Sequence, residues 1–316
     1  MKNYTFYTLI LCFFLFETQL QAASFSSLAT GNWNTSSTWT LVSGTDVDGI
    51  PDADDIVTVA LNHTITLDIA PTITSLIMSN GTLIGANGLA ILNDMTLSNG
   101  IFRPDGVVSV GGIFNWQGGT LGVSTSPSVF DIIVGGVANL SSAAKTLVKR
   151  TLILNGGGTW SAGDIAMLSD CVFRIPVGQK LTVSGSTTLN LTSSGSGTRL
   201  FDILGELEKT TTNSLIVQTI VNCTGKLNVL AGLLDFNAGG TLNGIVSFAA
   251  SSTLKITGGV LNIVQDMAMD GKVLISNALA TLTLSGAEVF GALEMLGGTL
   301  NLGVHVECAG SKRIPE

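Results

Sequence analysis

Ser79-Asn80-Gly81-Thr82-Leu83 is repeated as Ser98-Asn99-Gly100-Ile101-Phe102 and again as Gln117-Gly118-Gly119-Thr120-Leu121, with aligned glycines at 81, 100 and 119. Gly158-Thr159-Trp160 continues the series, close to two further steps along the chain. A fixed period of about 19 residues is typical of a solenoid, in which each turn of the chain forms one structural unit. The repeat therefore determines the fold strongly and the chemistry only weakly.

The same pattern returns near the C-terminus, where Gly-x-Leu-Asn recurs at 240–243, 259–262 and 298–301, after one step and then about two. Because side chains one period apart stack in columns inside a solenoid, we expect two inward columns. The first is Leu83, Phe102 and Leu121, and the second is Leu242, Leu261 and Leu300. The asparagines at 243, 262 and 301 share a register and are expected to point outward or to form a turn ladder.

Short apolar stretches, separated by Gly, Asn, Asp and Ser, read as strands: 56–59, 64–67, 107–110, 151–154, 180–183, 253–256 and 281–284. No stretch has convincing helical periodicity and caps, and the best candidate, 263–269, is short. A sandwich or barrel would not need a repeating sequence, so the period favours a coiled chain. The predicted fold is an all-β, single-stranded, right-handed parallel β-helix of about 19–20 residues per turn. Register is poor from Gly178 to Gly225, where we expect turns of varying length.

The first residues differ from the rest of the chain. Lys2 is followed by a short apolar stretch at 9–16 and by the small residues Ala22-Ala23, which is typical of a secretory signal peptide cleaved near Ala22-Ala23. We therefore expect a signal peptide at 1–22, an N-terminal cap and first turns at 23–68, and β-helix repeats at 69–316. The signal peptide predicts a location outside the cell or on its surface. No later apolar stretch is long enough for a transmembrane helix.

Composition excludes two classes of protein. A chain with 45% hydrophobic and 11% charged residues is not intrinsically disordered. A formal net charge of −8 argues against a nucleic-acid partner, because phosphate binding requires a basic surface.

The opening of the expected cap carries Gly31-Asn32-Trp33-Asn34, Ser37-Thr38-Trp39 and the run from Gly49-Ile50-Pro51 to Asp54-Asp55-Ile56-Val57. It resembles the opening of secreted, adhesin-like β-helix proteins of Bacteroidetes-type bacteria. It is similar, more weakly, to the eight-glycine domain of animal surface proteins. The resemblance implies a right-handed β-helix that is one module of a larger exported protein, often ending in a sorting domain. This sequence ends at Glu316 without such a domain, which agrees with a truncated array or with another export route.

Trp33 and Trp39 are expected to cover the first turn. The end of a β-helix exposes an unpaired strand edge and an apolar column, and large aromatic rings can close both. The alternative is a platform for stacking sugars, which requires both rings to be exposed.

Five carboxylates lie close together in the sequence, at Asp46, Asp48, Asp52, Asp54 and Asp55. Hard oxygen ligands at this density suit Ca²⁺, which is the only cofactor that the sequence suggests. The competing interpretation is a solvated turn, because Asp48-Gly49 and Pro51-Asp52 are ordinary turn formers.

Other site chemistries have little support. His63 and His305 are the only histidines, and no cysteines stand at zinc-ligand spacing, so no transition-metal site is expected. No Gly-x-Ser-x-Gly elbow is present. After the signal peptide, Cys171, Cys223 and Cys308 form an odd set that we interpret as buried thiols. A Cys171–Cys223 bridge requires closely stacked turns.

Many β-helix proteins cleave acidic glycans, so catalysis is the alternative function. The candidate charged pairs are Arg103 with Asp105, Asp164 with Asp170, and Arg174 with Asp202. Each reads more simply as a surface pair, and no catalytic residue is assigned. The sequence thus favours a non-catalytic structural or adhesive module whose partner is an extracellular glycan or matrix. The alternative is a polysaccharide lyase or hydrolase that uses a surface groove.

Overall fold

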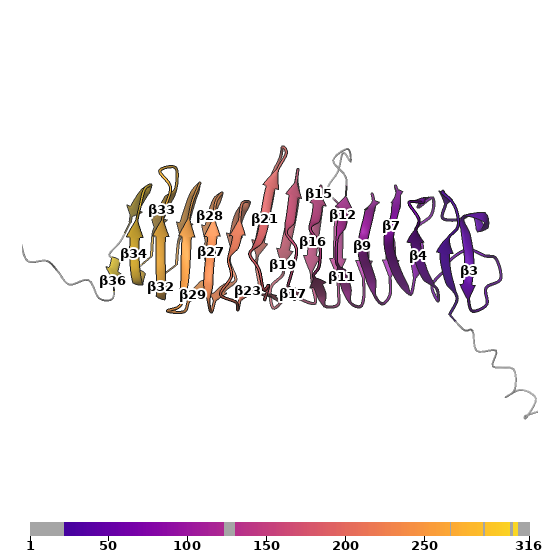
Figure 1. Ribbon diagram of the computed structural model, residues 1–316, viewed down its shortest axis with the longest axis horizontal. Coiled ribbons are helices and arrows are strands. Elements are labelled where there is room, and N and C mark those ends of the chain that lie inside the picture. Colours follow the sequence, from indigo (N-terminus) through magenta and orange to yellow (C-terminus); the bar gives the residue numbers. More distant parts are fainter. Residues whose placement is uncertain (1–21, 123–129, 266, 287, 304–305, 309–316) are drawn as a thin grey trace, which may run out of the picture.

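The computed structural model describes residues 22–122, 130–265, 267–286, 288–303 and 306–308. They form an elongated all-β parallel solenoid with the N-terminal region at one end and the last turns at the other (Figure 1). The described residues contain no α-helix, and the single 3-10 segment is η1 (Ser36–Thr38). The best helical candidate of the sequence, 263–269, is not a helix: its first residue ends β31 (Val260–Ile263) and its last three begin β32 (Met267–Ile275).

Each full turn visits three parallel faces, which we call face 1, face 2 and face 3. Face 3 is a sheet of twelve strands, one for each turn. These are β6 (Thr72–Ile73), β8 (Leu89–Ile91), β10 (Val108–Val110), β13 (Phe130–Val134), β16 (Arg150–Leu154), β19 (Cys171–Ile175), β22 (Arg199–Ile203), β25 (Ile220–Cys223), β28 (Gly239–Leu242), β31 (Val260–Ile263), β33 (Thr281–Leu284) and β35 (Thr299–Leu302). With neighbouring strands about 4.8 Å apart, twelve turns make a stack roughly 50–60 Å long.

Faces 1 and 2 share four long strands that bend around the corner between them: β7 (Ser75–Gly85), β9 (Met95–Pro104), β32 (Met267–Ile275) and β34 (Glu288–Met295). The remaining strands of face 1 are β1 (Ser24–Ser27), β4 (Ile56–Ala60), β11 (Phe114–Trp116), β14 (Ala138–Leu140), β17 (Gly158–Trp160), β20 (Lys180–Val183), β23 (Glu206–Lys209), β26 (Lys226–Val229), β29 (Ile245–Phe248) and β36 (Val306–Cys308). Those of face 2 are β2 (Gly31–Asn32), β5 (Thr64–Thr66), β12 (Gly119–Gly122), β15 (Lys145–Val148), β18 (Ile165–Leu168), β21 (Leu189–Ser194), β24 (Leu215–Val217), β27 (Gly232–Phe236) and β30 (Ser252–Ile256).

The repeated glycines mark the corner inside the long strands. Gly100 has a φ of +99°, and a Cβ on it would lie 2.2 Å from the carbonyl oxygen of Gly81 in the turn below. Only glycine tolerates both the positive φ and this close approach. The period in the sequence therefore reports the position of a bend that each turn must make at the same place.

Hydrogen bonds between side chains of neighbouring turns show where the period changes. Asn80 and Asn99, which bond to each other near the start of the stack, are 19 residues apart. Arg174 and its partner Asp202 are 28 residues apart, and the separation returns to 20 residues between Asp202 and Asn222. This confirms the prediction of turns of varying length between Gly178 and Gly225.

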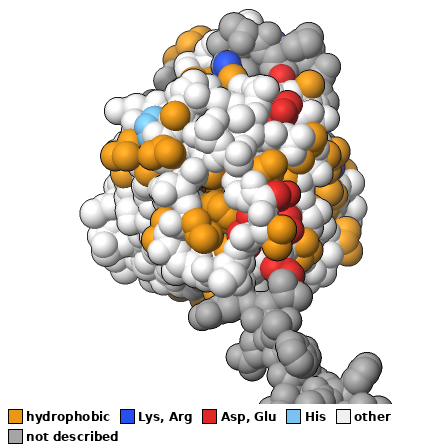
Figure 2. Space-filling model, turned by 90° about the vertical axis from the view of Figure 1, so that its right-hand side faces the viewer, with side chains coloured by type: hydrophobic (Ala, Val, Ile, Leu, Met, Phe, Trp, Pro, Cys, Tyr) orange, Lys and Arg blue, Asp and Glu red, His pale blue; other side chains and the backbone are white. Residues whose placement is uncertain are grey.

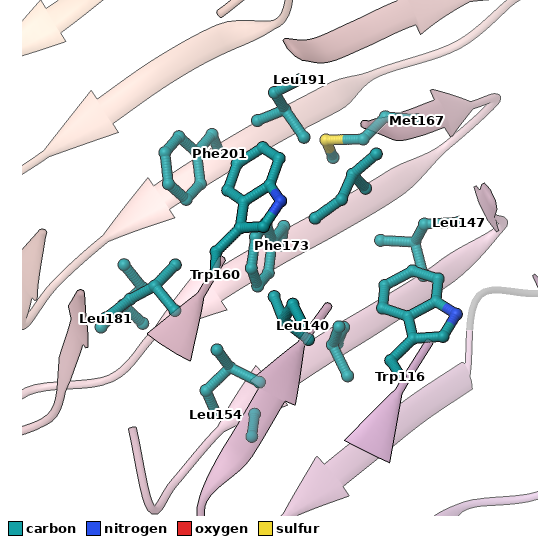
Figure 3. Packing of buried hydrophobic residues seen from close by; sticks show 14 of the residues in the cluster. Trp116, Leu140, Leu147, Leu154, Trp160, Met167, Phe173, Leu181, Leu191 and Phe201 are labelled. Carbon is teal, nitrogen blue, oxygen red and sulfur yellow. The ribbon is translucent and has the colours of Figure 1, made fainter. Parts of the chain in front are cut away.

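The interior is built from apolar side chains that alternate with outward residues along each strand. Leu83, Phe102 and Leu121 occupy one register and are fully buried, which confirms the first predicted column. Further along, Trp116, Leu140 and Trp160 stack in successive turns of face 1 (Figure 3). Such columns supply most of the stabilisation, because each buried ring or branched chain removes apolar area from water.

The second predicted column is wrong in part. Leu261 does pair onward through Leu282 to Leu300, but its partner in the preceding turn is Gly240 and not Leu242. Leu242 instead pairs with Ile263 in the next turn. Two consecutive glycines at 239–240 both lie in the paired strand, so the visible Gly-x-Leu motifs are offset by two positions from the true register.

An N-terminal region precedes the first full turn. Strand β1 pairs in parallel with β4 on one side and antiparallel with β3 (Trp39–Ser43) on the other, so that β3 covers the edge of the stack. Trp33 and Trp39 are buried and meet edge to face with centroids 4.9 Å apart. Their indole N–H groups donate to the carbonyls of Pro51 and Trp33. The expected cap packing is confirmed, and burial of both rings excludes the sugar-stacking alternative.

Candidate functional site

The acidic stretch forms a loop between β3 and β4 that is held by its own side chains. Asp46 Oδ1 accepts the backbone N–H of Asp48 at 3.1 Å, and Asp48 Oδ1 accepts that of Ile50 at 2.9 Å. Asp52 Oδ1 accepts the N–H of Asp54 at 3.2 Å. These are the local bonds by which aspartates stabilise turns. With Asp55, which accepts two further backbone N–H groups, four of the five predicted ligands also have a structural role.

Three of the five carboxylates come together. One oxygen each from Asp46, Asp52 and Asp55 lies within 4.8 Å of the other two. Asp48 and Asp54 line the same cavity, whose volume is about 220 Å³, but they lie outside this group of three. Figure 2 shows several Asp and Glu side chains, in red, on this end of the molecule. Three converging carboxylate oxygens suit a hard cation or any compact cationic group, and calcium binding stays a prediction.

Asp55 is the buried member, with 3% of its surface exposed. Its Oδ1 accepts the backbone N–H of Ala23 at 3.1 Å, and its Oδ2 accepts that of Asp52 at 2.8 Å. Burial raises the pKa of Asp55, and the nearby negative charges of Asp52 and Asp46 raise it further, against the lowering effect of the two backbone hydrogen bonds. The carboxylate therefore lacks a cationic partner among the groups that set its pKa.

A charged ladder crosses face 1 in the middle of the stack, and the sequence did not reveal it. Lys180, Glu206 and Lys226 occupy one outward register in three successive turns. Lys226 Nζ lies 3.2 Å from a Glu206 oxygen, and Lys180 Nζ lies 2.7 Å from Glu208 Oε1. The alternation of basic and acidic residues at the starts of these strands is a signal that could have found it. A shallow cavity of about 270 Å³ lies beside these residues, at the corner with face 3.

The three charged pairs considered for catalysis have structural partners. Arg174 Nε does lie 2.8 Å from Asp202 Oδ2, as expected if the turns align, and Asp202 also accepts from Asn222. Asp105 instead lies 3.6 Å from the buried Arg150.

The two members of the third pair, Asp164 and Asp170, accept hydrogen bonds from different residues. Asp164 accepts both the backbone N–H and the side-chain amide of Asn190, whereas Asp170 accepts the N–H of Thr198. The structure thus places these two carboxylates in separate hydrogen-bonding arrangements and brings no pair together across a groove in the described residues.

The predicted asparagine register is also wrong in part. Asn262 is in line with Thr283 and Asn301, but its partner in the preceding turn is Thr241. Asn243 lies beyond the strand, where its Oδ1 accepts the side-chain amide of Gln265 at 2.9 Å. The offset has the same origin as that of the second leucine column.

The remaining candidates behave as structural residues. His63 Nδ1 lies 3.1 Å from the carbonyl oxygen of Ser27, in a turn between β4 and β5. Cys171 and Cys223 are buried and unbridged, and burial raises the pKa of each thiol to about 12. The alternative of a disulfide between them is therefore wrong. His305 and the Cys308 side chain lie outside the described residues.

Two buried lysines are the least expected feature. Lys145 and Lys209 are each 1% exposed and lie at the corner between faces 1 and 2. Lys145 Nζ donates to the carbonyls of Ala143 and Ala162, and Lys209 Nζ donates to those of Thr211 and Ala231. Burial lowers the pKa of both ammonium groups to about 8. They join carbonyls of successive turns where the chain leaves the strand ladder.

Comparison of the chain with family models, with curated proteins and with solved structures finds no match. In the part of the chain that the structure describes, no helix is long and apolar enough to cross a membrane. The fold and the side-chain contacts therefore carry the functional argument.

Proposed function

We propose that this protein is exported and works outside the cell as an elongated, non-catalytic structural or adhesive module that binds glycan or matrix along one flank. The observation that carries the proposal is that the outward-facing charged side chains of face 1 pair with one another. Lys180, Glu206, Glu208 and Lys226 neutralise one another from turn to turn. A reacting carboxylate needs room for substrate and a tuned pKa, whereas a binding surface needs a rigid pattern of donors and acceptors.

The flank that suits a glycan is the corner between faces 3 and 1. Asn228 donates to Glu208 of the charged ladder, and on face 3 Asn222 donates to Asp202, so hydrogen bonds fix both amide groups. Sugar hydroxyls both donate and accept, so alternating amines, carboxylates and amides complement them. Because the positions repeat with the turns, the surface matches a repeating polymer better than a single small molecule.

Binding to immobilised polysaccharides tests the proposal. The double variant Lys180→Ala/Lys226→Ala is expected to lose retention on the polysaccharide that wild type binds. Lys272→Ala, which removes a partly exposed lysine of face 2 that pairs with Glu294, serves as the matched control. Equal retention of the three proteins would contradict binding at this flank. Release of new reducing ends or unsaturated products from the bound polysaccharide would contradict a non-catalytic role.

Export is tested separately by the intact mass of the native protein in medium and cell-envelope fractions. A mass that begins near Ala23 in either fraction is expected, and a mass that includes the first residues in the cytosol would contradict export. A larger mass on the envelope would place this chain within a longer surface protein.

A further inference from the structure

We propose that the group which completes the acidic pocket is the α-ammonium of Ala23, formed when the leader is removed between Ala22 and Ala23. The proposal rests on the export part of the proposed function and is independent of glycan binding. It assigns the cap a second task, which is to hold the mature N-terminus.

The contact that carries the inference is already present. Ala23 is 1% exposed, its backbone nitrogen lies 3.1 Å from Asp55 Oδ1, and Asp55 is itself buried. The Ala23 carbonyl accepts the N–H of Ile56 at 2.9 Å, so Ala23 is fixed from both sides. Cutting the preceding bond changes the charge on this nitrogen without requiring it to move.

Ala22 and Ala23 differ in their exposure to solvent. Ala22 is exposed, and its carbonyl lies beside Gly44, whose φ is +87° and where a Cβ would lie 2.7 Å from that carbonyl oxygen. Ala23 lines the same cavity as Asp46, Asp52 and Asp55.

The chemistry is a peptide hydrolysis by a leader peptidase. Water adds to the Ala22 carbonyl, the C–N bond to Ala23 breaks, Ala22 keeps the carboxylate, and the new amine takes up the proton. An α-amino group is largely protonated at neutral pH. Its three N–H donors match the three carboxylate oxygens that lie within 4.8 Å of one another.

The same cleavage would give the buried Asp55 carboxylate a cationic partner. Before cleavage, Asp55 is a buried carboxylate among like charges, and burial raises its pKa. An ammonium at hydrogen-bond distance supplies the missing opposite charge, and a buried charge gains most from a partner in such surroundings. Leader removal would then tighten the cap that covers the edge of the whole stack.

The test compares three forms of the chain that differ only at the N-terminus: one that begins at Ala23, the same chain with an acetylated N-terminus, and one that begins at Ala22. The free Ala23 form is expected to melt about 2–4 °C above the other two. In Asp55→Asn this difference should vanish, whereas Asp54→Asn, an exposed carboxylate of the same loop, should retain it. Equal melting of the three forms in the wild-type background would overturn the proposal.

A labelling experiment keeps the proposal falsifiable if Asp55→Asn does not fold. The α-amine of the folded Ala23 form is expected to react with an acylating reagent at least tenfold more slowly than in denaturant, and labelling at equal rates would overturn the proposal. Calcium that raises the melting temperature of this form would also overturn it, by assigning the carboxylates to a metal. N-terminal sequencing of the native protein locates the cut: a start at Ala23 supports the proposal, and any other start contradicts it. None of these outcomes depends on glycan binding.

Discussion

The cap and the corner between faces 1 and 2 both bury a charged side chain, but of opposite sign. In the cap, Asp55 accepts the backbone N–H groups of Ala23 and Asp52. At the corner, Lys145 and Lys209 donate to backbone carbonyls of two successive turns. Because a buried backbone group without a partner is costly, the chain places an acceptor where N–H groups are left over and a donor where carbonyls are left over. The sign of the buried charge thus follows from the backbone.

Removing the buried acid should have the largest effect. Asp55→Ala leaves the buried N–H of Ala23 and the partly buried N–H of Asp52 without their acceptor, so we expect a loss of about 3 kcal/mol in unfolding free energy. Chemical denaturation of wild type, Asp55→Ala and the exposed control Asp54→Ala measures it. A loss below about 1 kcal/mol would mean that the cap rearranges to satisfy these groups, and the comparison with the corner would then fail.

Removing a buried base should have a smaller effect that depends on pH. Lys209→Met keeps the volume and leaves two carbonyls without donors, but it also relieves the cost of a buried charge, so we expect a loss of about 1–2 kcal/mol at pH 7. Burial lowers the pKa of Lys209 from 10.5 in the unfolded chain to about 8. The unfolded chain therefore binds more protons between these values, and this lysine makes the folded state more stable as pH rises from 8 towards 10.5.

Lys209→Met lacks this gain in stability at high pH. The difference between wild type and Lys209→Met should widen by about 2 kcal/mol between pH 7 and pH 9.5. Denaturation of both proteins at the two pH values measures the change, and Lys255→Met, which removes a partly exposed lysine that pairs with the buried Asp235, is the control. A difference that stays constant would show that the Lys209 ammonium does not titrate in this range.

The sequence predicted the features that recur from turn to turn, and it did not predict those that occur in single turns. The spacing of Gly81, Gly100 and Gly119 predicted the turn, the parallel stacking and the first inward column, because these early turns place a glycine at the same corner bend. The second column failed where two glycines at 239–240 hid the register. The buried lysines gave no signal, since a lone lysine at a strand end reads as a solvated residue.

The candidate site shows the same limit. Five aspartates close together in the sequence predicted an acidic pocket, and three of them do converge. The sequence could not show that Ala23 donates to Asp55, because 32 residues separate the two and the contact depends on β1 lying beside β4. Contacts between one turn and the next follow from the period, whereas contacts in the cap follow from how the chain enters the stack.

The surface pair Lys180–Glu208 should contribute least to the free energy of unfolding. The comparison of buried charges does not extend to it. Here both side chains reach solvent, and neither satisfies a buried backbone group. Their mutual hydrogen bond raises the pKa of Lys180 and lowers that of Glu208, but water and salt screen most of this attraction. A double-mutant cycle with Lys180→Ala and Glu208→Gln should give a coupling below about 1 kcal/mol, falling as salt is added. A coupling as large as the loss in Lys209→Met would mean that the ladder behaves as a network, and that charge pairing between turns, and not only the backbone, holds this flank rigid.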